Sequence, residues 1–379
     1  MGADRDPDRL SYWNRIGNLV LTWCRFFVAA CQEYRPKLLS MKLPEPIIVD
    51  PQSVPSLRWG IIGPGRIAET FVAATQKHTS QRFVAVASRT SGRAQEFASK
   101  FNIPKTFASY EDLVADEEID AVYISSHMSD HFEHAMLAIN AGKNILVEKP
   151  ITYLPEEAEQ IFAAAKQAKV LAMEAMWTRY LPQSTILRQL LESGDLGKPE
   201  LLTASFCADN RAVERLWKPG GGGIVFDMGI YPIAIAQEML GEPSSIAATG
   251  RVRPDGMDEE SYSLLNYESG ARASLTISGI AALPMLAHCS FENAVISLGE
   301  PFFVPSSISL KTKDFYPEQT TWVDESGIAG HEGLSYQATW FAKYLSEGKL
   351  ESDVHTHAQT LANIRTAFEI TKQIGAKPF

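Results

Sequence analysis

The sequence predicts an α/β protein: an N-terminal Rossmann-type, doubly wound parallel sheet followed by a C-terminal α/β domain with a large open, mostly antiparallel sheet. Short apolar runs alternate with helical patterns between residues 58 and 175, which is typical of a parallel sheet flanked by helices. From Gly197 onward apolar runs follow one another, and turns such as Glu268-Ser269-Gly270 separate several of them. Successive strands joined by turns predict antiparallel pairing.

In the N-terminal half, each expected strand is followed by an expected helix. The apolar runs predict strands at 58–62, 82–88, 121–125, 144–147 and 170–175. The helical patterns span 67–76, 91–101, 110–115, 131–141 and 155–168. In such sheets ligands bind at the carboxyl ends of the strands, so we expect the functional residues there.

In the C-terminal half, strands dominate. We expect them at 201–207, 246–252, 261–267, 271–279, 286–291, 294–298 and 307–311. Helices are expected at 183–193, 225–239, 336–346 and 357–374. An open sheet of this size leaves one face to be covered, and subunit association is a common way to cover it.

The segment Gly63-Pro64-Gly65-Arg66-Ile67-Ala68 joins the first expected strand to its helix. Gly63 permits a tight turn, Gly65 lets the backbone approach a pyrophosphate, and Ala68 allows close packing of the helix on the sheet. Free N–H groups at the helix start suit phosphates. This context favours a dinucleotide site over an ordinary glycine-rich turn. We assign cofactor contacts to Gly63, Gly65, Arg66 and Ile67.

The end of the second expected strand indicates which dinucleotide binds. NAD sites usually place an acidic residue about 20 residues after the glycines, whereas this strand ends in Ala87-Ser88-Arg89-Thr90. A carboxylate would repel a 2′-phosphate, while Arg89 can pair with one and Ser88 can donate a hydrogen bond. We therefore expect NADP, bound by Ser88 and Arg89. The alternative is that Arg89 is a solvated surface residue.

Composition limits the class of protein. The chain has 379 residues, of which 45% are hydrophobic and 21% charged, as in soluble globular proteins of two domains. The net charge of −10 argues against nucleic acid as a partner. Four scattered cysteines without a C-x-x-C pair indicate a reducing compartment and no structural zinc. We expect a cytoplasmic location.

Residues 1–56 form an N-terminal extension, which precedes an expected NADP-binding domain, 57–177, and a substrate-binding and oligomerisation domain, 178–379. Helical spacing over 10–34 predicts an amphipathic helix, and the prolines of 44–55 predict an extended linker. The helix has few basic residues on its polar side, which favours packing on the protein or a sister subunit. Contact of residues 10–34 with a membrane surface is the alternative. The apolar run 19–31 is too short to span a bilayer.

The segment Glu148-Lys149-Pro150 ends a buried strand and is therefore expected on the ligand side of the sheet. Lys149 beside a nicotinamide can exchange a proton with a reacting oxygen, and burial would lower its pKa toward that task. The alternative is a surface lysine in a strand–helix connection.

Asp227 and Tyr231 follow the glycines 220–223 at i, i+4 and should share one helix face. With Lys149 they are the candidate catalytic group: the lysine charge would favour the phenolate, and Asp227 would orient its neighbours. The alternative is a hydrogen-bonded pair in a helix that packs on the sheet.

Trp177 and Arg179 leave the last parallel strand near the expected cleft. An indole and a guanidinium suit a polyhydroxylated or aromatic ligand, so these two residues and Tyr231 are candidate substrate contacts. Interdomain packing with an ion pair to Glu174 is the alternative.

The remaining candidate cofactor contacts follow the third and fourth strands. They are Ser125, His127, His131, Glu148 and Lys149. We assign no metal site, because no carboxylate is spaced to complete one with His127, His131 and His134. The pair His355-x-His357 is interpreted as a surface turn.

Three motifs together resemble the Gfo/Idh/MocA oxidoreductases over about residues 57–379. They are Gly63-x-Gly65-x-x-Ala68, Glu148-Lys149-Pro150, and Gly221-Gly222-Gly223 through Asp227-x-Gly229-x-Tyr231. Many members have histidine where this chain has Tyr231. Tyrosine there, with the segment 173–180, is similar to the branch of dimeric dihydrodiol dehydrogenases and NADP-dependent D-xylose dehydrogenases.

The resemblance implies a function and partners. In that branch the residues matching Lys149 and Tyr231 are the proposed acid/base pair. The expected reaction is hydride transfer between NADP and a sugar hydroxyl or vicinal diol, by a homodimer or homotetramer formed through the open sheet. Two alternatives stay open. One is a reductase of a ketosugar such as anhydrofructose. The other is a non-catalytic NADP-binding regulatory protein that docks through 10–34.

Overall fold

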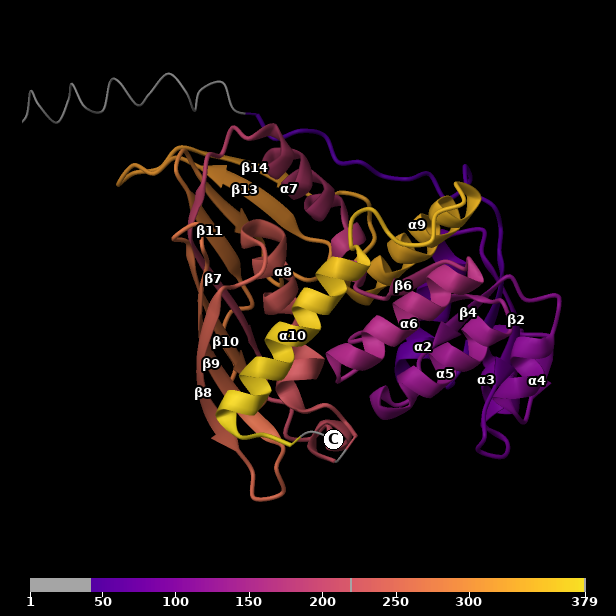
Figure 1. Ribbon diagram of the computed structural model, residues 1–379. Coiled ribbons are helices and arrows are strands. Elements are labelled where there is room, and N and C mark those ends of the chain that lie inside the picture. The colour runs from indigo at the N-terminus through magenta and orange to yellow at the C-terminus, as the bar shows by residue number, and fades with distance from the viewer. Residues whose placement is uncertain (1–41, 219, 378–379) are drawn as a thin grey trace, which may run out of the picture.

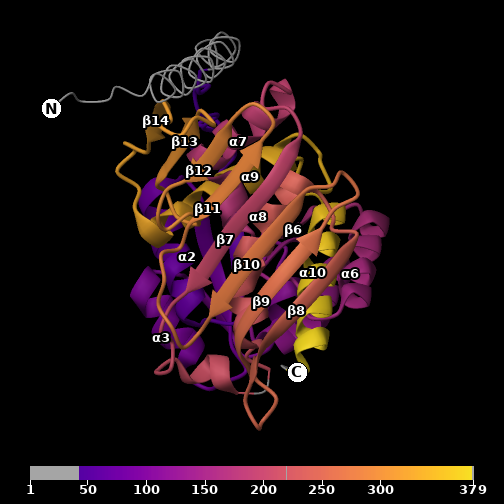
Figure 2. The ribbon, with the colours of Figure 1, turned by 90° about the vertical axis from the view of Figure 1, so that its left-hand side faces the viewer.

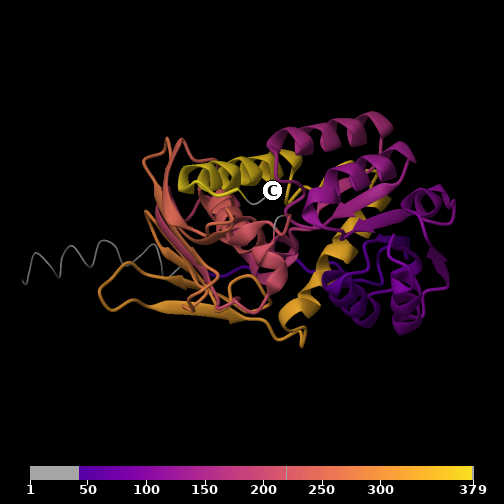
Figure 3. The ribbon, with the colours of Figure 1, turned by 90° about the horizontal axis from the view of Figure 1, so that it is seen from below.

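The computed structural model describes residues 42–218 and 220–377. Two sheets with their helices lie side by side, and helices of the C-terminal half fill the space between them (Figure 1, Figure 3). The helix expected at 10–34 lies outside the described residues. Among the described helices, none is long and apolar enough to cross a membrane.

The N-terminal sheet is parallel throughout, with the strand order β3-β2-β1-β4-β5-β6. Its strands are β1 (Arg58–Ile62), β2 (Arg82–Ala87), β3 (Lys105–Phe107), β4 (Ala121–Ile124), β5 (Asn144–Val147) and β6 (Ala172–Glu174). The order reverses between β1 and β4, which is the switch point where ligands bind in doubly wound sheets. The expected parallel fold is confirmed. Strand β3 escaped prediction because it has three residues and none of them is buried.

Helices cover both faces of this sheet. They are α2 (Arg66–His78), α3 (Arg93–Phe101), α4 (Tyr110–Ala115), α5 (His131–Asn140) and α6 (Pro155–Ala168). Aromatic side chains fill one interface: Phe71 of α2 stacks on Tyr123 of β4 with ring centres 4.1 Å apart. A helix from the other half closes this layer, because Phe341 of α9 (Leu334–Ser346) lies 4.8 Å from the ring of Trp59.

The C-terminal sheet has the strand order β14-β13-β12-β11-β7-β10-β9-β8. Its strands are β7 (Pro199–Cys207), β8 (Ser245–Val252), β9 (Asp258–Asn266), β10 (Arg272–Ser278), β11 (Ala287–Phe291), β12 (Val295–Leu298), β13 (Ser307–Lys311) and β14 (Gln319–Val323). Strands β7 and β10 are parallel, and the other neighbours within the described chain are antiparallel. The expected mostly antiparallel sheet is therefore confirmed. The polar edge strand β14 was missed because most of its residues are exposed.

Within the described residues, helices cover one face of the large sheet and not the other. The inner face carries α7 (Pro182–Ser193), α8 (Ile230–Leu240) and α10 (His357–Ile374). Figure 2 views the outer face, on which no described helix lies. Leu201, Tyr262 and Leu264 are about half exposed on this sheet, at 51%, 46% and 60%. Buried and exposed residues alternate along β9, as expected for a sheet with one face packed in the protein and the other exposed to solvent.

The leading segment 42–56 contains neither helix nor strand, as the prolines predict. Its first part lies on α7, where Ile47 N donates to Thr185 Oγ1 at 2.8 Å and Gln189 Nε2 donates to the Glu45 carbonyl at 2.9 Å. Its last part joins the parallel sheet, with Val54 buried in the core. The segment runs along the top of the molecule in Figure 1.

Candidate active site

A cavity of about 830 Å³ lies between the carboxyl ends of the parallel strands and the helix-covered face of the large sheet. It extends from Arg89 beyond β2, past the glycine turn and Lys149, to Tyr231 and Phe303. The predicted cofactor residues Gly63, Gly65, Arg66, Ile67, Ser88, Arg89, Ser125, His127, His131, Glu148 and Lys149 all line it. The strand ends therefore bring residues from distant parts of the sequence into one site.

The glycine turn between β1 and α2 is built for close backbone approach. Gly63 has φ +86°, and a Cβ there would lie 2.6 Å from the backbone nitrogen of Ser126. A Cβ on Gly65 would meet nothing nearer than 4.0 Å, and no described side chain caps the start of α2. The Ser125 hydroxyl fixes the turn by donating to the Gly63 carbonyl at 2.9 Å. The first N–H groups of α2 are thus left for an anionic ligand such as a pyrophosphate, and the site fits a dinucleotide.

Arg89 lies at the end of the cavity that is far from Tyr231, beyond the carboxyl end of β2. Its Nη2 donates to Asp130 Oδ2 at 2.8 Å, and its guanidinium carbon lies 5.4 Å from the centre of the Tyr110 ring. Arg93 also lines this end and donates to the Pro64 carbonyl at 3.4 Å. Ser88 Oγ accepts from Thr90 N at 3.1 Å. The carboxylate that pairs with Arg89 belongs to Asp130 in η1 (Met128–Asp130). Sequence analysis did not predict this contact.

Glu148 directly follows β5 and is a buried residue of the cavity lining. Tyr123 donates a hydrogen bond to its Oε1, and Lys149 N donates to its Oε2 at 3.2 Å. Burial raises the pKa of Glu148 to about 7, although the Tyr123 hydrogen bond and the Lys149 charge act in the opposite direction. This carboxyl therefore changes charge near neutral pH.

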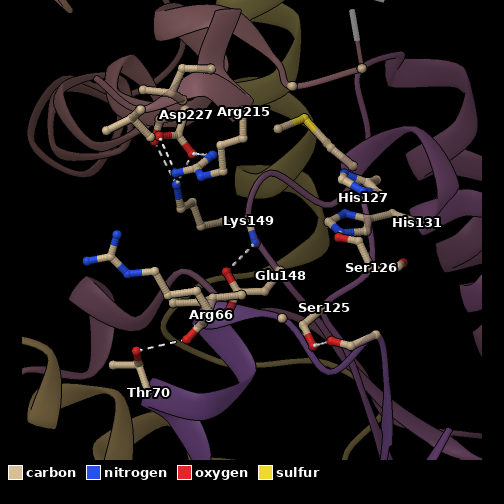
Figure 4. Close-up of a pocket in the computed structure, with 18 of the residues that line it drawn as sticks. Arg66, Thr70, Ser125, Ser126, His127, His131, Glu148, Lys149, Arg215 and Asp227 are labelled. Atoms are coloured by element: carbon tan, nitrogen blue, oxygen red, sulfur yellow. Dashed lines mark hydrogen bonds and ion pairs between the residues drawn. The ribbon is translucent and has the colours of Figure 1, made fainter. Parts of the chain in front are cut away.

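Lys149 reaches across the cavity to the C-terminal half (Figure 4). Its Nζ donates to the Asp227 carbonyl at 2.6 Å and lies 3.4 Å from Asp227 Oδ1. Burial opposes its charge, but Asp227, Tyr231 and Glu148 outweigh burial and raise the pKa of Lys149. Burial lowers the pKa of Lys149, as expected, but the net shift is upward because the acidic neighbours together outweigh burial. Lys149 is an ammonium at neutral pH.

Tyr231 faces the cavity from the start of α8. Its ring lies 4.9 Å from Lys149 Nζ, and its hydroxyl accepts a hydrogen bond from Trp177 Nε1 at 3.0 Å. Burial raises the pKa of Tyr231, against the lowering effects of Lys149 and Trp177. The lysine therefore favours the phenolate, as expected, but burial prevails and the phenol is protonated at neutral pH.

The segment carrying Asp227 is a single π-helical turn, η4 (Val225–Gly229), which runs into α8. The chain is helical over the whole of the expected range 225–239, but the first turn is π-helical rather than α-helical. Asp258 of β9 fixes its start, since Asp258 Oδ2 accepts from Val225 N at 2.7 Å. Gly223 has φ +61°, and a Cβ there would lie 1.8 Å from Asp258 Oδ1. A glycine is required because the chain passes directly over this buried carboxylate.

Aromatic side chains line the end of the cavity near Tyr231. Phe206 stacks on Phe303 with ring centres 4.4 Å apart, and Tyr231 stacks on Phe303 at 5.2 Å. Trp177 lies 5.5 Å from the ring of His331, which η5 (Gly330–Gly333) carries into the cavity. A ligand with an apolar ring face fits between such side chains.

Arg179 is not among the described residues that line the cavity. Its guanidinium is buried, pairs with Glu238 and donates to the Val354 carbonyl at 3.0 Å. The assignment of Arg179 as a substrate contact is therefore not supported by its position. The turn η2 (Trp177–Tyr180) directs Trp177 into the site and Arg179 into the protein interior.

The interpretation of His355 and His357 as a surface turn is wrong. His355 is buried and lies 2.7 Å from Glu174 Oε2, so Glu174 pairs with His355 rather than with Arg179. His357 begins α10 and stacks on Phe162, with ring centres 3.8 Å apart.

Histidines 127 and 131 lie together beside the cavity (Figure 4). The His131 ring nitrogens contact the carbonyls of Pro150 at 3.1 Å and Ser126 at 3.3 Å, and burial lowers its pKa to about 4. Across residues 42–218 and 220–377, no group of His, Cys, Asp and Glu side chains could hold a metal ion.

Several residues of the site were missed by sequence reasoning, among them Arg215 and His331 of the cavity lining and Asp258, which holds the turn that carries Asp227. Arg215 comes from η3 (Glu214–Trp217) and pairs with Asp227. Each lies in a turn or at a strand end without a periodic pattern, and each reaches the site through the fold. Only the neighbouring glycines 220–223 could have drawn attention to Arg215.

Comparison with known proteins agrees with this geometry. Residues 57–176 match the model of the oxidoreductase family with an NAD-binding Rossmann fold, and residues 185–293 match the GFO/IDH/MocA C-terminal domain. The trans-1,2-dihydrobenzene-1,2-diol dehydrogenase of Mus musculus is 32% identical over 328 residues, covering 84% of this chain and 97% of the relative. The Homo sapiens enzyme of the same name is 32% identical over 330 residues, with the same coverage.

Solved structures share the fold. A levoglucosan dehydrogenase in complex with NADH and levoglucosan superposes with a TM-score of 0.76 at 18% identity, covering 84% of this chain and 97% of that one. A variant of a 3-ketoreductase from Actinomadura kijaniata, in complex with TDP-benzene and NADP, gives a TM-score of 0.70 at 25% identity, with coverage of 85% and 98%. The chain belongs to the Gfo/Idh/MocA family and is an NAD(P)-dependent oxidoreductase.

Proposed function

We propose that the protein is an NADP-dependent dehydrogenase that oxidises a hydroxyl group of a sugar or of a vicinal diol. The observation that carries this proposal is the cluster of Lys149, Asp227 and Tyr231 at the cavity. It faces the carboxyl end of β5, next to a glycine turn that fits a pyrophosphate. The cofactor held at the glycine turn would accept the hydride, and the cluster would supply the proton acceptor. Oxidation of a C–OH group requires both.

Each residue of the cluster has a separate task in the proposed reaction. Bound NADP supplies the hydride acceptor. The phenolate form of Tyr231 accepts the proton of the substrate hydroxyl at Oη and becomes the neutral phenol, and the Trp177 indole N–H stabilises the phenolate through its hydrogen bond of 3.0 Å. The Lys149 ammonium offsets the negative charge that develops on the phenol and the substrate oxygen. Asp227 holds Lys149 through its carbonyl and carboxylate.

Two features support the choice of substrate class. The stacked rings of Phe206, Phe303 and Tyr231 suit a cyclic substrate with an apolar face. The relatives at 32% identity are named as dehydrogenases of a cyclic diol. A cyclic vicinal diol and a pyranose both combine an apolar face with hydroxyl groups on the ring edge.

Reduction of a ketosugar is the second candidate. Tyr231 and Lys149 both have raised pKa values, so both carry their protons at neutral pH. Protonated groups are poised to donate to a carbonyl oxygen, which is the reverse of the oxidation above. A non-catalytic regulatory role is less well supported, because a protein that only binds NADP has no use for this cluster.

NADP rather than NAD is favoured by the arginines at the far end of the cavity. Arg89 and Arg93 both line that end, and a 2′-phosphate would accept charge-assisted hydrogen bonds from them. Asp130 holds Arg89 in place through the ion pair of 2.8 Å. We also propose a homodimer or homotetramer that buries the outer face of the large sheet.

The test is turnover by the purified protein with NADP and a panel of aldoses, inositols and a trans-dihydrodiol. Formation of reduced cofactor is followed by its absorbance, the panel is repeated with NAD, and ketosugars are tested with NADPH. Oxidation of one class with NADP supports the dehydrogenase. Reduction alone supports the second candidate. Tight NADP binding without turnover in either direction would overturn both and favour a regulatory protein.

A further inference from the structure

Arg215 makes a two-pronged contact with the carboxylate of Asp227. Its Nη1 lies 3.1 Å from Asp227 Oδ1, and its Nη2 lies 3.1 Å from Asp227 Oδ2. Such parallel N–H···O bonds fix the plane of a carboxylate as well as its position. Figure 4 shows Arg215 beside Asp227, with the Lys149 side chain reaching the same residue.

Asp227 is therefore held by two cations from different parts of the chain. Lys149 Nζ binds its carbonyl at 2.6 Å and approaches Oδ1 at 3.4 Å. The Asp227 side chain is 17% exposed, whereas the Arg215 side chain is 60% exposed at the mouth of the cavity. Arg215 thus reaches a buried carboxylate from the solvent side.

The loop that carries Arg215 is tied down at both ends. Leu216 is buried, and Trp217 Nε1 donates to the Asn210 carbonyl at 2.9 Å. A Cβ on Gly221 would lie 1.8 Å from the Arg215 carbonyl oxygen. A Cβ on Gly222 would lie 2.7 Å from the Met128 Cε atom of η1. The glycine run lets this loop fold tightly over the cavity and against the parallel half.

We propose that Arg215 is a positioning residue of this site: its guanidinium fixes the Asp227 carboxylate against Lys149 and so aims the Lys149 ammonium at Tyr231. The inference rests on the proposed function of Lys149 and Tyr231. Arg215 has no role of its own in proton or hydride transfer. It sets the geometry of the residues that do.

Electrostatics agrees with this assignment. Burial opposes ionisation of Asp227, but Lys149 and Arg215 outweigh burial and lower its pKa. In the described part of the chain, the charged or titratable groups that face Asp227 are Glu148 and Lys149, which follow β5, Tyr153, Tyr231 of α8, and Arg215. Without Arg215, burial is opposed by Lys149 alone, and the pKa of Asp227 rises.

The experiment compares Arg215→Met and Arg215→Lys with the control Arg211→Met. Arg211 lies in the same loop, its side chain is 61% exposed, and its ion pair is with the local Asp209. It is absent from the described cavity lining. We expect kcat of Arg215→Met to fall about 10- to 100-fold, as for displaced catalytic groups, with the NADPH dissociation constant within about twofold of wild type. Arg211→Met should match wild type.

Three readouts separate positioning from a general structural role. The acidic limb of the kcat profile should move to higher pH in Arg215→Met and stay near wild type in Arg215→Lys, which keeps the charge. Tens of millimolar guanidinium should restore part of the activity of Arg215→Ala and leave Arg211→Ala unchanged. In an Asp227→Asn background, Arg215→Met should have no further effect on kcat. Unchanged kcat in Arg215→Met, or an additive loss in the double variant, would overturn the inference.

A measurement without turnover keeps this inference distinct from the proposed function. Urea unfolding of wild type, Arg215→Met, Asp227→Asn and the double variant reports the coupling of the two side chains. Coupling in an inactive wild type would mean that the ion pair is real and the proposed reaction is wrong. An active wild type with no coupling would leave the reaction in place and reject Arg215 as the positioning residue.

Discussion

The ammonium of Lys149 lies over the ring of Tyr231, 4.9 Å from its centre, while it binds the Asp227 carbonyl at 2.6 Å. The lysine comes from the parallel half of the chain and the tyrosine from the helix behind the large sheet. The positive charge is thus held against the face of a phenol, where it responds to any negative charge that the phenol acquires. This arrangement forms only when both halves of the chain are folded against each other.

Replacing Lys149 with Met should lower kcat by about 100-fold or more, because the charge that stabilises the phenolate is lost. Cofactor binding should largely persist, since the glycine turn and Arg89 are untouched. Steady-state kinetics and NADPH fluorescence titration measure the two effects. The exposed Lys166 on α6 supplies the control Lys166→Met. Near-normal turnover in Lys149→Met would contradict the assigned role.

Replacing Arg89 with Ala should weaken binding of NADP about 10- to 100-fold, which is the loss expected for hydrogen bonds to a charged group. Binding of NAD, which lacks the 2′-phosphate, should change by less than about twofold. Calorimetric titration with both cofactors tests this difference. Arg82→Ala, at the exposed start of β2, is the matched control. Equal losses for both cofactors would argue against the NADP assignment.

Oxidation should accelerate as the pH rises. The pKa of Tyr231 is raised above its ordinary value of 10.0, so only a small fraction is phenolate at pH 7. While proton transfer limits the rate, kcat should climb about tenfold per pH unit, since the phenolate fraction does so. Tyr231→Phe should lose this limb and most activity, whereas Tyr262→Phe on the outer sheet face should keep both. A flat profile in wild type would exclude Tyr231 as the proton acceptor.

Glu148 should make stability depend on pH. Its pKa is raised from 4.5 to about 7 in the folded protein, so the folded state binds the proton more tightly than the unfolded chain. The stabilisation is complete below about pH 4.5 and is lost as the pH rises through 7; the shift corresponds to about 3 kcal/mol. Calorimetric melting should show the Tm of wild type falling relative to that of Glu148→Gln as the pH rises through that range. The exposed Glu133 provides the control Glu133→Gln, and a pH-independent difference would contradict the shift.

The outer face of the large sheet should mediate self-association. Leu264→Lys places a charge among residues that are half exposed in the single chain, and burial of an unpaired charge is costly. Light scattering after gel filtration should give a dimer or tetramer for wild type and a smaller species for Leu264→Lys. Ile48→Lys, at a side chain that is 50% exposed on the leading segment, should leave the mass unchanged. A monomeric wild type would refute the proposed assembly.

The fold was predictable because its signals are local. Alternating apolar runs specified the parallel strands, and β1, β5, α4, α6 and α10 begin and end where the sequence pattern indicates. The glycine turn and Glu148-Lys149-Pro150 identified cavity residues because the ends of parallel strands meet at one edge. Periodicity does not mark β3 or β14, since neither presents a run of buried apolar residues.

The parts of the site that escaped prediction depend on contacts between distant residues. The pKa of Lys149 rises mainly because Asp227, 78 residues away in the sequence, folds against it, and Tyr231 and the adjacent Glu148 add to the rise. Arg179 and His355 are polar residues in short connections, for which sequence analysis predicted a substrate contact and a surface turn, yet the partners Glu238 and Glu174 make their burial tolerable. The sequence pattern predicts where the site lies, whereas the ion pairs within it and their effect on each pKa are seen only in the three-dimensional structure.

The segment 42–56 is fastened to both halves of the chain, between which the cavity lies. Glu45 and Ile47 are tied to α7 of the C-terminal half. Gln81 of the parallel half donates to the Pro55 carbonyl at 2.8 Å and accepts from Leu57 N at 3.1 Å. The segment contains a turn at residues 50–53, so an opening of one half away from the other first straightens this turn and then must detach an anchor. The leading segment is thereby a mechanical tether between the two halves of the chain.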